Sequence, residues 1–216
     1  MLTIHTIPGS PYGRSVLTTC IEKGAPYRLQ VVRPGTHRQA PYTDLHPFSK
    51  IPAVEDGDFR LYETQAIIRY VDAAYGTPRA LTPDDPKAEA RMNQAIGLID
   101  CYFFAPGSAM TLGFNRVVAP KLGFPVDEAA AVASLPGTKH CIDVLAGFVE
   151  RSPYIAGDAF SLADIHAGCH LELLSRAPEA DALFQGTPIP AWLERLAARP
   201  SFAATTWERV AELAAA

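Results

Sequence analysis

A serine stands where a predicted strand gives way to a predicted helix near the start of the chain. Ser10 lies in the turn PGSPYG at residues 8–13, between the β-branched segment 2–7 and an apolar pattern with helical spacing. A hydroxyl at a helix N-terminus lies in a field that favours anions, so it could donate to a bound thiolate. The alternative is that Ser10 is only the N-cap of the helix.

A site of this kind could lower the pKa of a bound thiol enough to ionise it at neutral pH. A thiol with a pKa of about 8.5 is only about 3% ionised at pH 7. Lowering this pKa by about two units, which helix N-termini can do, makes the thiol roughly three-quarters thiolate. The change corresponds to about 2.7 kcal/mol of differential stabilisation.

Two further clusters could bind the charged ends of a peptide. We expect Thr64 to cap a helix, so that its hydroxyl and nearby N–H groups could hold a carboxylate, while Glu63 could hold an ammonium group. A second carboxylate could bind to His37, Arg38 and Lys50. The alternatives are a plain helix cap with a solvated glutamate, and a solvated basic loop.

The dipeptide Ile51-Pro52 completes the set. A residue that precedes proline is restricted to extended geometry. If the bond is cis, the backbone of Ile51 turns outward and could pair with a bound peptide. Together the signals describe a ligand with a carboxylate at one end, an amino-acid zwitterion at the other and a thiol between them. Glutathione has this chemistry.

The elements that must position these residues form a compact α/β pattern. We expect strands at 2–7 and 27–31, a hairpin with an Asp-Gly turn over 51–62, and helices after the turn at 8–13 and over 64–75. This order is the layout of a thioredoxin-like domain. The turn occupies the place of the C-P-Y-C of glutaredoxins with both sulfurs replaced, which excludes dithiol redox chemistry through this pair.

The rest of the chain reads as helical. We predict a thioredoxin-like domain over 1–76, a proline-rich linker over 77–86, and an all-α helical bundle over 87–216. The helices are expected at about 87–104, 127–150, from 161, 191–198 and 201–214. Ser161 and Asp164 have the spacing of a capping box, with Phe160 and Ile165 placed as a hydrophobic staple.

Composition excludes several classes of protein. The chain has 216 residues, 48% of them hydrophobic, and a formal net charge of −4, which argues against a nucleic-acid partner. No apolar run approaches the roughly 18 residues of a membrane helix, and the N-terminus lacks the features of a signal peptide. The four cysteines match no metal-site spacing, so we expect no metal, and free buried thiols in a reducing cytoplasm.

The sequence resembles the glutathione transferases over essentially its whole length, and is most similar to their phi class. The matching stretches are SPYGRSVL from Ser10, HR at His37, HPFSKIPAVEDG from His46, LYET from Leu61, FNRVVAPKLGFPVDEA from Phe114, and YIAGDAFSLADIH from Tyr154. The last stretch, with its capping box, is highly specific for the helical domain of this family.

The resemblance implies a role for each glutathione-site residue. It implies that Ser10 stabilises the glutathione thiolate, with Ser15 or Tyr12 as the next hydroxyls to consider. His37 and Arg38 match a pair that holds the glycine carboxylate. Lys50 stands where the family often has glutamine, Ile51 matches a residue that bonds the cysteinyl unit through its backbone, and Pro52 matches the family's cis-proline. Glu63 and Thr64 match a pair that holds the γ-glutamyl end.

Other residues are expected to meet the second substrate or a partner subunit. The second-substrate candidates, expected between the domains, are Tyr12, Phe103, Phe104, Met110 and Phe114, with Trp207 as a weaker one. Their spacing is equally typical of a helical core. Phe48 matches an aromatic residue that inserts into the partner of a homodimer, and the alternative is that it covers the core of its own chain.

The resemblance implies an enzyme that conjugates glutathione to a small hydrophobic electrophile, with a role in detoxification. Glutathione would be the co-substrate, with no cofactor or metal and no nucleic-acid or membrane partner. One alternative is glutathione-dependent peroxide reduction, dehalogenation or ether cleavage on the same site. The other is a non-catalytic scaffold protein of the same fold.

Overall fold

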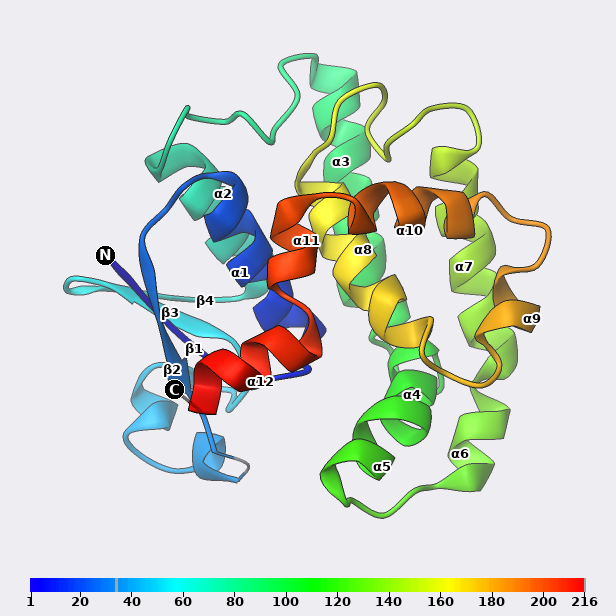
Figure 1. Ribbon diagram of the computed structural model, residues 1–216, viewed down its shortest axis with the longest axis horizontal. Helices are drawn as coiled ribbons and strands as arrows, with labels where there is room; N and C mark the ends of the chain where they lie inside the picture. The colour runs from blue at the N-terminus through cyan, green and yellow to red at the C-terminus, as the bar shows by residue number, and fades with distance from the viewer. Residues whose placement is uncertain (34, 216) are drawn as a thin grey trace. The chain divides into compact units, whose positions relative to one another are not determined.

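The computed structural model describes residues 1–33 and 35–215 (Figure 1). They form two compact units, one made of residues 1–81 together with the segment from residue 197 onward, the other of residues 82–196. The C-terminal segment, which the sequence pattern assigns to the helical domain, therefore packs with the first unit.

The first unit is built on a four-stranded mixed sheet in the order β2-β1-β3-β4. β1 pairs in parallel with β2, and β3 pairs antiparallel with β4, as the predicted strand-helix-strand and hairpin require. β1 also pairs antiparallel with β3, which joins the two parts into one sheet. The elements are β1 (Leu2–Thr6), α1 (Pro11–Glu22), β2 (Tyr27–Val31), the 3₁₀ turns η1 (Thr36–Arg38) and η2 (Tyr42–Asp44), β3 (Ala53–Asp56), β4 (Phe59–Tyr62) and α2 (Thr64–Ala74).

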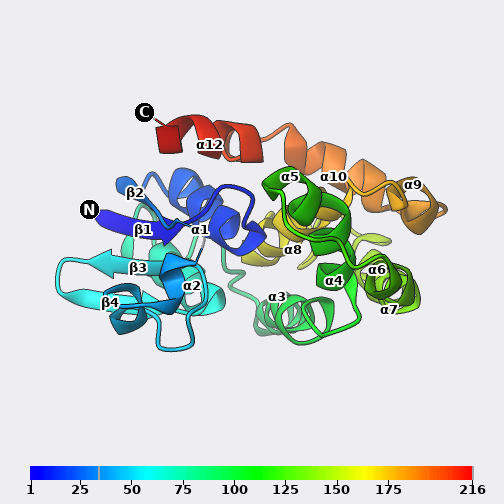
Figure 2. The same cartoon turned by 90° about the horizontal axis from the view of Figure 1, so that it is seen from below.

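The core of this unit lies between the sheet and the α1–α2 pair. Leu2 and Ile4 on β1 are completely buried, as are Val16 on α1 and Ile67 on α2. The C-terminal helices are α11 (Pro200–Ala204) and α12 (Trp207–Ala215). α11 packs against α1, and α12 lies beside β2 (Figure 2).

The second unit is helical throughout. Its elements are α3 (Pro86–Leu98), the π-helical η3 (Ile99–Phe103), α4 (Ala109–Gly113), the π-helical η4 (Phe114–Val118), α5 (Ala119–Leu122), α6 (Glu128–Ala133), α7 (Leu135–Val149), α8 (Leu162–Leu174), α9 (Ala180–Phe184) and α10 (Ile189–Ala197). In the part of the chain that the structure describes, no helix has the length and apolar character to cross a membrane.

The predicted capping box is present at the start of α8. Asp164 accepts from the backbone N–H and the hydroxyl of Ser161, at 3.0 and 2.8 Å. Its other oxygen accepts from the N–H of Ile155 at 2.9 Å and from the indole of Trp192 at 3.1 Å. Burial raises the pKa of Asp164, and these donors oppose that rise. The carboxyl group thus ties α8 to α10 and to the preceding loop.

Two predicted helices are each divided in two. The helix expected over 127–150 breaks at Ser134, because Pro136 in the first turn of α7 has no N–H to continue the bonding of α6. The helix expected over 201–214 breaks at Thr205, whose hydroxyl donates to the carbonyl of Ser201 while its backbone leaves helical geometry. Both breaks are local and leave the fold class as predicted.

Candidate active site

Ser10 is the N-cap of α1. Its backbone is extended, Pro11 is the first helical residue, and its Oγ accepts from the N–H of Gly13 at 3.1 Å. Because the oxygen acts as an acceptor in this bond, its own proton is not used in it and can be donated to a ligand. The N-cap interpretation and the thiolate-donor interpretation are therefore compatible.

Gly13 stands where only glycine fits. A Cβ on this residue would lie 1.8 Å from Oγ1 of Thr6 at the end of β1. The close approach of β1 to the first turn of α1 excludes any larger side chain unless Thr6 moves. The second cysteine of a glutaredoxin-type C-P-Y-C turn, which would stand at this position, is excluded in the same way. The sequence motif alone did not reveal this contact.

The neighbouring hydroxyl of Ser15 is bonded within α1. Ser15 is completely buried, and its Oγ donates to the carbonyl of Pro11 at 2.9 Å. Tyr12 is half-buried. Ser10 is therefore better placed than Ser15 to meet a ligand at the start of α1.

The C-terminal segment supports the same turn from the other side. A Cβ on Gly9, whose φ is +84°, would lie 2.6 Å from the ring of Trp207. Trp207 is buried, so this second-substrate candidate packs against the Ser10 turn within the first unit. This support was not predictable from local patterns, since almost two hundred residues separate the partners.

Further contacts hold the length of α1. Arg14 is buried and donates to the carbonyl of Phe202 at 3.2 Å. The hydroxyls of Thr18 and Thr205 are 2.9 Å apart. Glu22, in the last turn of α1, accepts two hydrogen bonds from Arg199, at 2.9 and 2.7 Å. The helix that carries Ser10 is thus fixed at several turns.

The three predicted cations come close together. His37 and Arg38 lie in η1, and Lys50 lies in the segment before β3. Burial, then the positive charges of Arg38 and Lys50, lower the pKa of His37. The Nδ1 atom of His37 is shielded from solvent and has no hydrogen-bond partner among the described residues. This arrangement favours an anion as ligand.

The peptide bond between Ile51 and Pro52 is cis, as the resemblance implies. It directly precedes β3, whose first residue Ala53 pairs with His5 on one side and Tyr62 on the other. Ile51 therefore lies just before the start of β3 and directly after Lys50.

The start of α2 differs in detail from the prediction. Thr64 is the first helical residue and is buried, and the N-cap position belongs to Glu63, which makes no side-chain cap bond. The expectation that Thr64 caps the helix is wrong, because the chain enters α2 through a left-handed backbone at Glu63, with φ +69°. The first N–H groups of the helix still point out of its N-terminus, where a carboxylate can accept from them.

Glu63 itself is exposed and strained. A positive φ in so sparsely populated a region costs a residue with a Cβ on the order of 1–3 kcal/mol. Such strain persists where the surrounding structure imposes it, and it is common at binding sites. The outward Glu63 beside the N-terminus of α2 places an acceptor for an ammonium group next to donors for a carboxylate.

The aromatic candidates of the second unit divide into two groups. Phe103 is 1% exposed and meets the ring of His170 edge-on, which is the position of a core residue. Phe104 and Phe114 are 40% and 41% exposed, and Met110 is half-buried. Phe114 stacks on Phe124 with ring centroids 6.3 Å apart. Sequence reasoning did not single out Phe124, although it belongs to one of the matching stretches.

Phe48 projects from the first unit. Its side chain is 70% exposed, with its edge toward Tyr62 and His46. A ring this exposed does not cover the core of its own chain.

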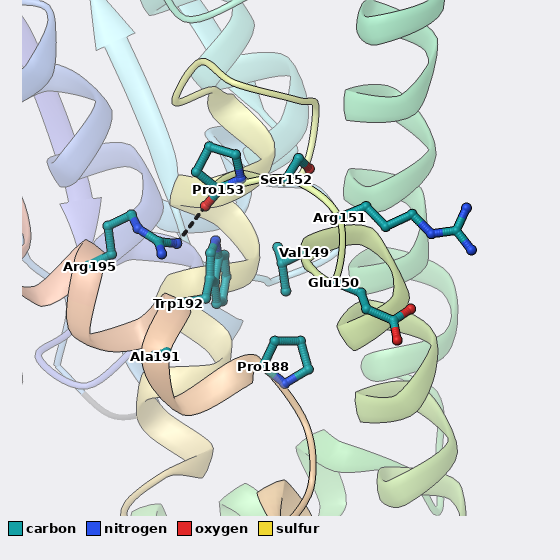
Figure 3. A pocket seen from close by; sticks show the side chains of 9 residues that line it. All are labelled: Val149, Glu150, Arg151, Ser152, Pro153, Pro188, Ala191, Trp192 and Arg195. Carbon is teal, nitrogen blue, oxygen red and sulfur yellow. Dashed lines mark hydrogen bonds between the residues drawn. The ribbon is translucent and has the colours of Figure 1, made fainter.

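A separate pocket of about 320 Å³ lies in the second unit, at the end of α7 and along α10 (Figure 3). At one side of it Arg195 donates to the carbonyl of Pro153 at 2.7 Å. None of the candidate residues lines it. Within residues 1–33 and 35–215, no group of His, Cys, Asp and Glu side chains is arranged to hold a metal ion.

A thioredoxin-like unit with a serine at the start of α1, a cation cluster and a cis-proline defines a class of glutathione-using proteins with a helical second unit. Family models support this assignment. One described as "Glutathione S-transferase, N-terminal domain" matches residues 4–79, and one described as "Glutathione S-transferase, C-terminal domain" matches residues 107–200.

Individual relatives agree over nearly the whole chain. A glutathione S-transferase of Hyoscyamus muticus is 31% identical, with 93% of this chain and 95% of the relative covered. Glutathione S-transferase F14 of Arabidopsis thaliana is 31% identical, with 91% and 80% covered. The structure of maize glutathione S-transferase I in complex with an atrazine glutathione conjugate superposes with a TM-score of 0.80 at 25% identity, covering 98% of this chain and 97% of that one.

The chain belongs to the glutathione S-transferase family. The resemblance to the phi class is confirmed by its plant relatives, and the protein is an enzyme of this family.

Proposed function

We propose that the protein activates the thiol of glutathione at Ser10 and transfers glutathione to a small hydrophobic electrophile. The observation that carries this proposal is the geometry of Ser10, an N-cap that accepts from Gly13 and keeps its own proton for a ligand. Family membership supplies the reaction class, and the cation cluster and the start of α2 supply binding groups for the two ends of the tripeptide.

In the proposed binding mode each part of glutathione meets a different element. His37, Arg38 and Lys50 hold the glycine carboxylate. The backbone of Ile51 pairs with the cysteinyl unit beside the cis-proline Pro52. The γ-glutamyl end places its carboxylate on the first N–H groups and the hydroxyl of Thr64, and its ammonium group near Glu63. Binding at both ends orients the sulfur before reaction.

The chemical step needs only a thiolate and an oriented electrophile. The thiol proton goes to solvent, and the sulfur anion accepts the hydroxyl proton of Ser10 as a hydrogen bond. The bond from Gly13 to the serine oxygen strengthens that donation, since hydrogen bonds in a chain polarise one another. A sulfur lone pair then forms the new C–S bond, and the leaving group departs with the electrons of the bond that breaks.

We further propose that the electrophile meets Tyr12, Phe104, Met110 and Phe114. The exposure of Phe104 and Phe114 supports this, and so does the atrazine conjugate held by the maize structure. Such a substrate class fits a role in detoxification.

We also propose a cytoplasmic homodimer, in which exposed Phe48 contacts the partner. Cys20, Cys141 and Cys169 are buried thiols, which suit a reducing compartment, while Cys101 is exposed, contrary to the expectation that the thiols are buried.

Replacement of Ser10 tests the proposal. In Ser10→Ala we expect the pKa of bound glutathione, measured from thiolate absorbance against pH, to rise by about one to two units. Because a thiol pKa raised above the working pH leaves about tenfold less thiolate per unit, we expect kcat/KM to fall about 10- to 100-fold at neutral pH. Ser15→Ala is the matched control, because that buried hydroxyl faces Pro11, and its thiolate pKa should equal that of the wild type. An unchanged pKa and turnover in Ser10→Ala would contradict the proposal.

A further inference from the structure

The segment between Phe48 and Pro52 has a strained turn. Ser49 has φ +54°, a left-handed conformation that glycine adopts freely and that is strained for a residue with a Cβ. Its N–H donates to the carbonyl of His46 at 2.9 Å. Lys50 and Ile51, two of the proposed glutathione contacts, follow directly, so the geometry of this turn sets their positions.

Tyr42 holds this turn from inside the unit. Its hydroxyl donates to the carbonyl oxygen of Lys50 at 2.7 Å. Its ring is buried with Val32 and Ala53, and the side chain of Ile51 packs against the same cluster. Burial raises the pKa of Tyr42, so its hydroxyl stays protonated and remains a donor at physiological pH. Lys50 and Ile51 are thus anchored at adjacent points.

The anchor is itself connected to the sheet. The ring of His5 on β1 meets Tyr42 edge-on, with ring centroids 6.3 Å apart. His5 Nε2 lies 2.8 Å from a carboxylate oxygen of Glu55 on β3. The tyrosine therefore transmits the rigid geometry of two paired strands to a turn that has no regular secondary structure of its own.

We propose that Tyr42 is a positioning residue for glutathione, which fixes the strained Ser49–Lys50 turn so that the charge of Lys50 and the backbone of Ile51 face the ligand. The inference rests on the proposed placement of glutathione against residues 50–52. Without the hydroxyl, the turn relaxes away from its left-handed conformation, and binding weakens. The thiolate is stabilised from α1, a different element, so the chemical step at saturation is unaffected.

Tyr42→Phe removes only the hydroxyl and keeps the buried ring. One hydrogen bond of this kind contributes about 1 kcal/mol, so we expect the KM for glutathione to rise about three- to tenfold with kcat unchanged. Tyr70→Phe is the matched control, since it removes a tyrosine hydroxyl bonded to Asp56 at 2.7 Å in the same unit. Its KM should equal that of the wild type. Equal KM values in Tyr42→Phe and Tyr70→Phe would overturn the inference.

A second pair of variants distinguishes the inference from the function it rests on. Ser49→Gly in the Tyr42→Phe background should recover most of the lost affinity, because glycine adopts φ +54° without penalty. An absence of recovery would overturn the role given to the strained turn. If Lys50→Ala leaves glutathione affinity unchanged, the placement of glutathione is wrong. If Lys50→Ala weakens binding and Tyr42→Phe does not, only the role of Tyr42 fails.

Discussion

His37 shows how single residues tune this site before any ligand arrives. In the free protein, burial and the charges of Arg38 and Lys50 lower the pKa of His37, so the ring is largely neutral at pH 7. A carboxylate placed among these groups reverses the balance, because an opposite charge favours the protonated ring. Binding of the proposed glycine carboxylate should therefore raise the pKa of His37 and take up a proton.

This coupling predicts the pH dependence of binding. Affinity should increase as pH falls through the pKa of His37 in the complex, and level off below its pKa in the free protein. S-methylglutathione suits the measurement, because it has no thiol proton to release. Calorimetric titration in buffers of different ionisation enthalpy should detect proton uptake in the wild type and none in His37→Gln. Equal uptake in both proteins would contradict the role of His37.

At the scale of elements, the contact between α1 and the C-terminal segment makes a stability prediction. Burial acts to raise the pKa of Glu22, but hydrogen bonds from Arg199 and Ser201 outweigh it, and the net effect lowers this pKa. Arg199→Ala should reduce the free energy of unfolding at pH 7 by about 1–3 kcal/mol, because it removes two charge-assisted bonds.

The sign of the pKa shift defines the pH window of this effect. A carboxyl with a lowered pKa in the folded state stabilises above its unfolded pKa, and the contribution is lost as pH falls through the folded value. Urea unfolding of the wild type and Arg199→Ala should therefore begin to converge as pH falls below about 4.3, the pKa of an unfolded glutamate, and should coincide below the folded pKa of Glu22. Arg209→Ala breaks an exposed pair with Glu212 and should change stability by less than about 0.5 kcal/mol. Similar losses in both variants would contradict the prediction.

Some helices and strands could be predicted from the sequence and others could not. β2 has the predicted bounds, and the capping box at Ser161 and Asp164 is present, because alternation and capping are local signals. The single helices expected over 127–150 and 201–214 are wrong, because periodicity does not register a local break. The support that Trp207 and Arg199 give α1 comes from distant contacts that no local pattern encodes.

In the candidate site, too, local sequence signals were predictable and non-local features were not. Ser10 at the N-cap and the cis bond before Pro52 agree with prediction, since each belongs to a short motif. The cap assigned to Thr64 is wrong, because backbone strain at Glu63 has no sequence signal in a residue that is not glycine. Sequence reasoning did not single out Tyr42. Its hydroxyl donates to the carbonyl of Lys50, eight residues away in an irregular loop, and no local pattern marks such a contact.

At the scale of the whole molecule, exposed Phe48 predicts the assembly state. A phenylalanine that is 70% exposed leaves apolar surface in water, and the proposed homodimer would bury it. Phe48→Ala should therefore raise the dimer dissociation constant about tenfold or more in sedimentation experiments. Phe59→Ala, also exposed in the first unit, is the matched control and should leave it unchanged. A monomeric wild type, or equal constants for both variants, would contradict the prediction.

The return of the C-terminal segment to α1 also governs when this protein can fold. Residues 14–22 meet their partners at positions 199–205, and the turn before Ser10 meets Trp207. During synthesis these partners leave the ribosome only after the entire second unit has been made. The strands of the first unit are made early, but α1 is fully held only after residues 199–207 have been translated. Ribosome-bound chains that stop before Arg199 therefore carry the motif of the active site without the contacts that fix it.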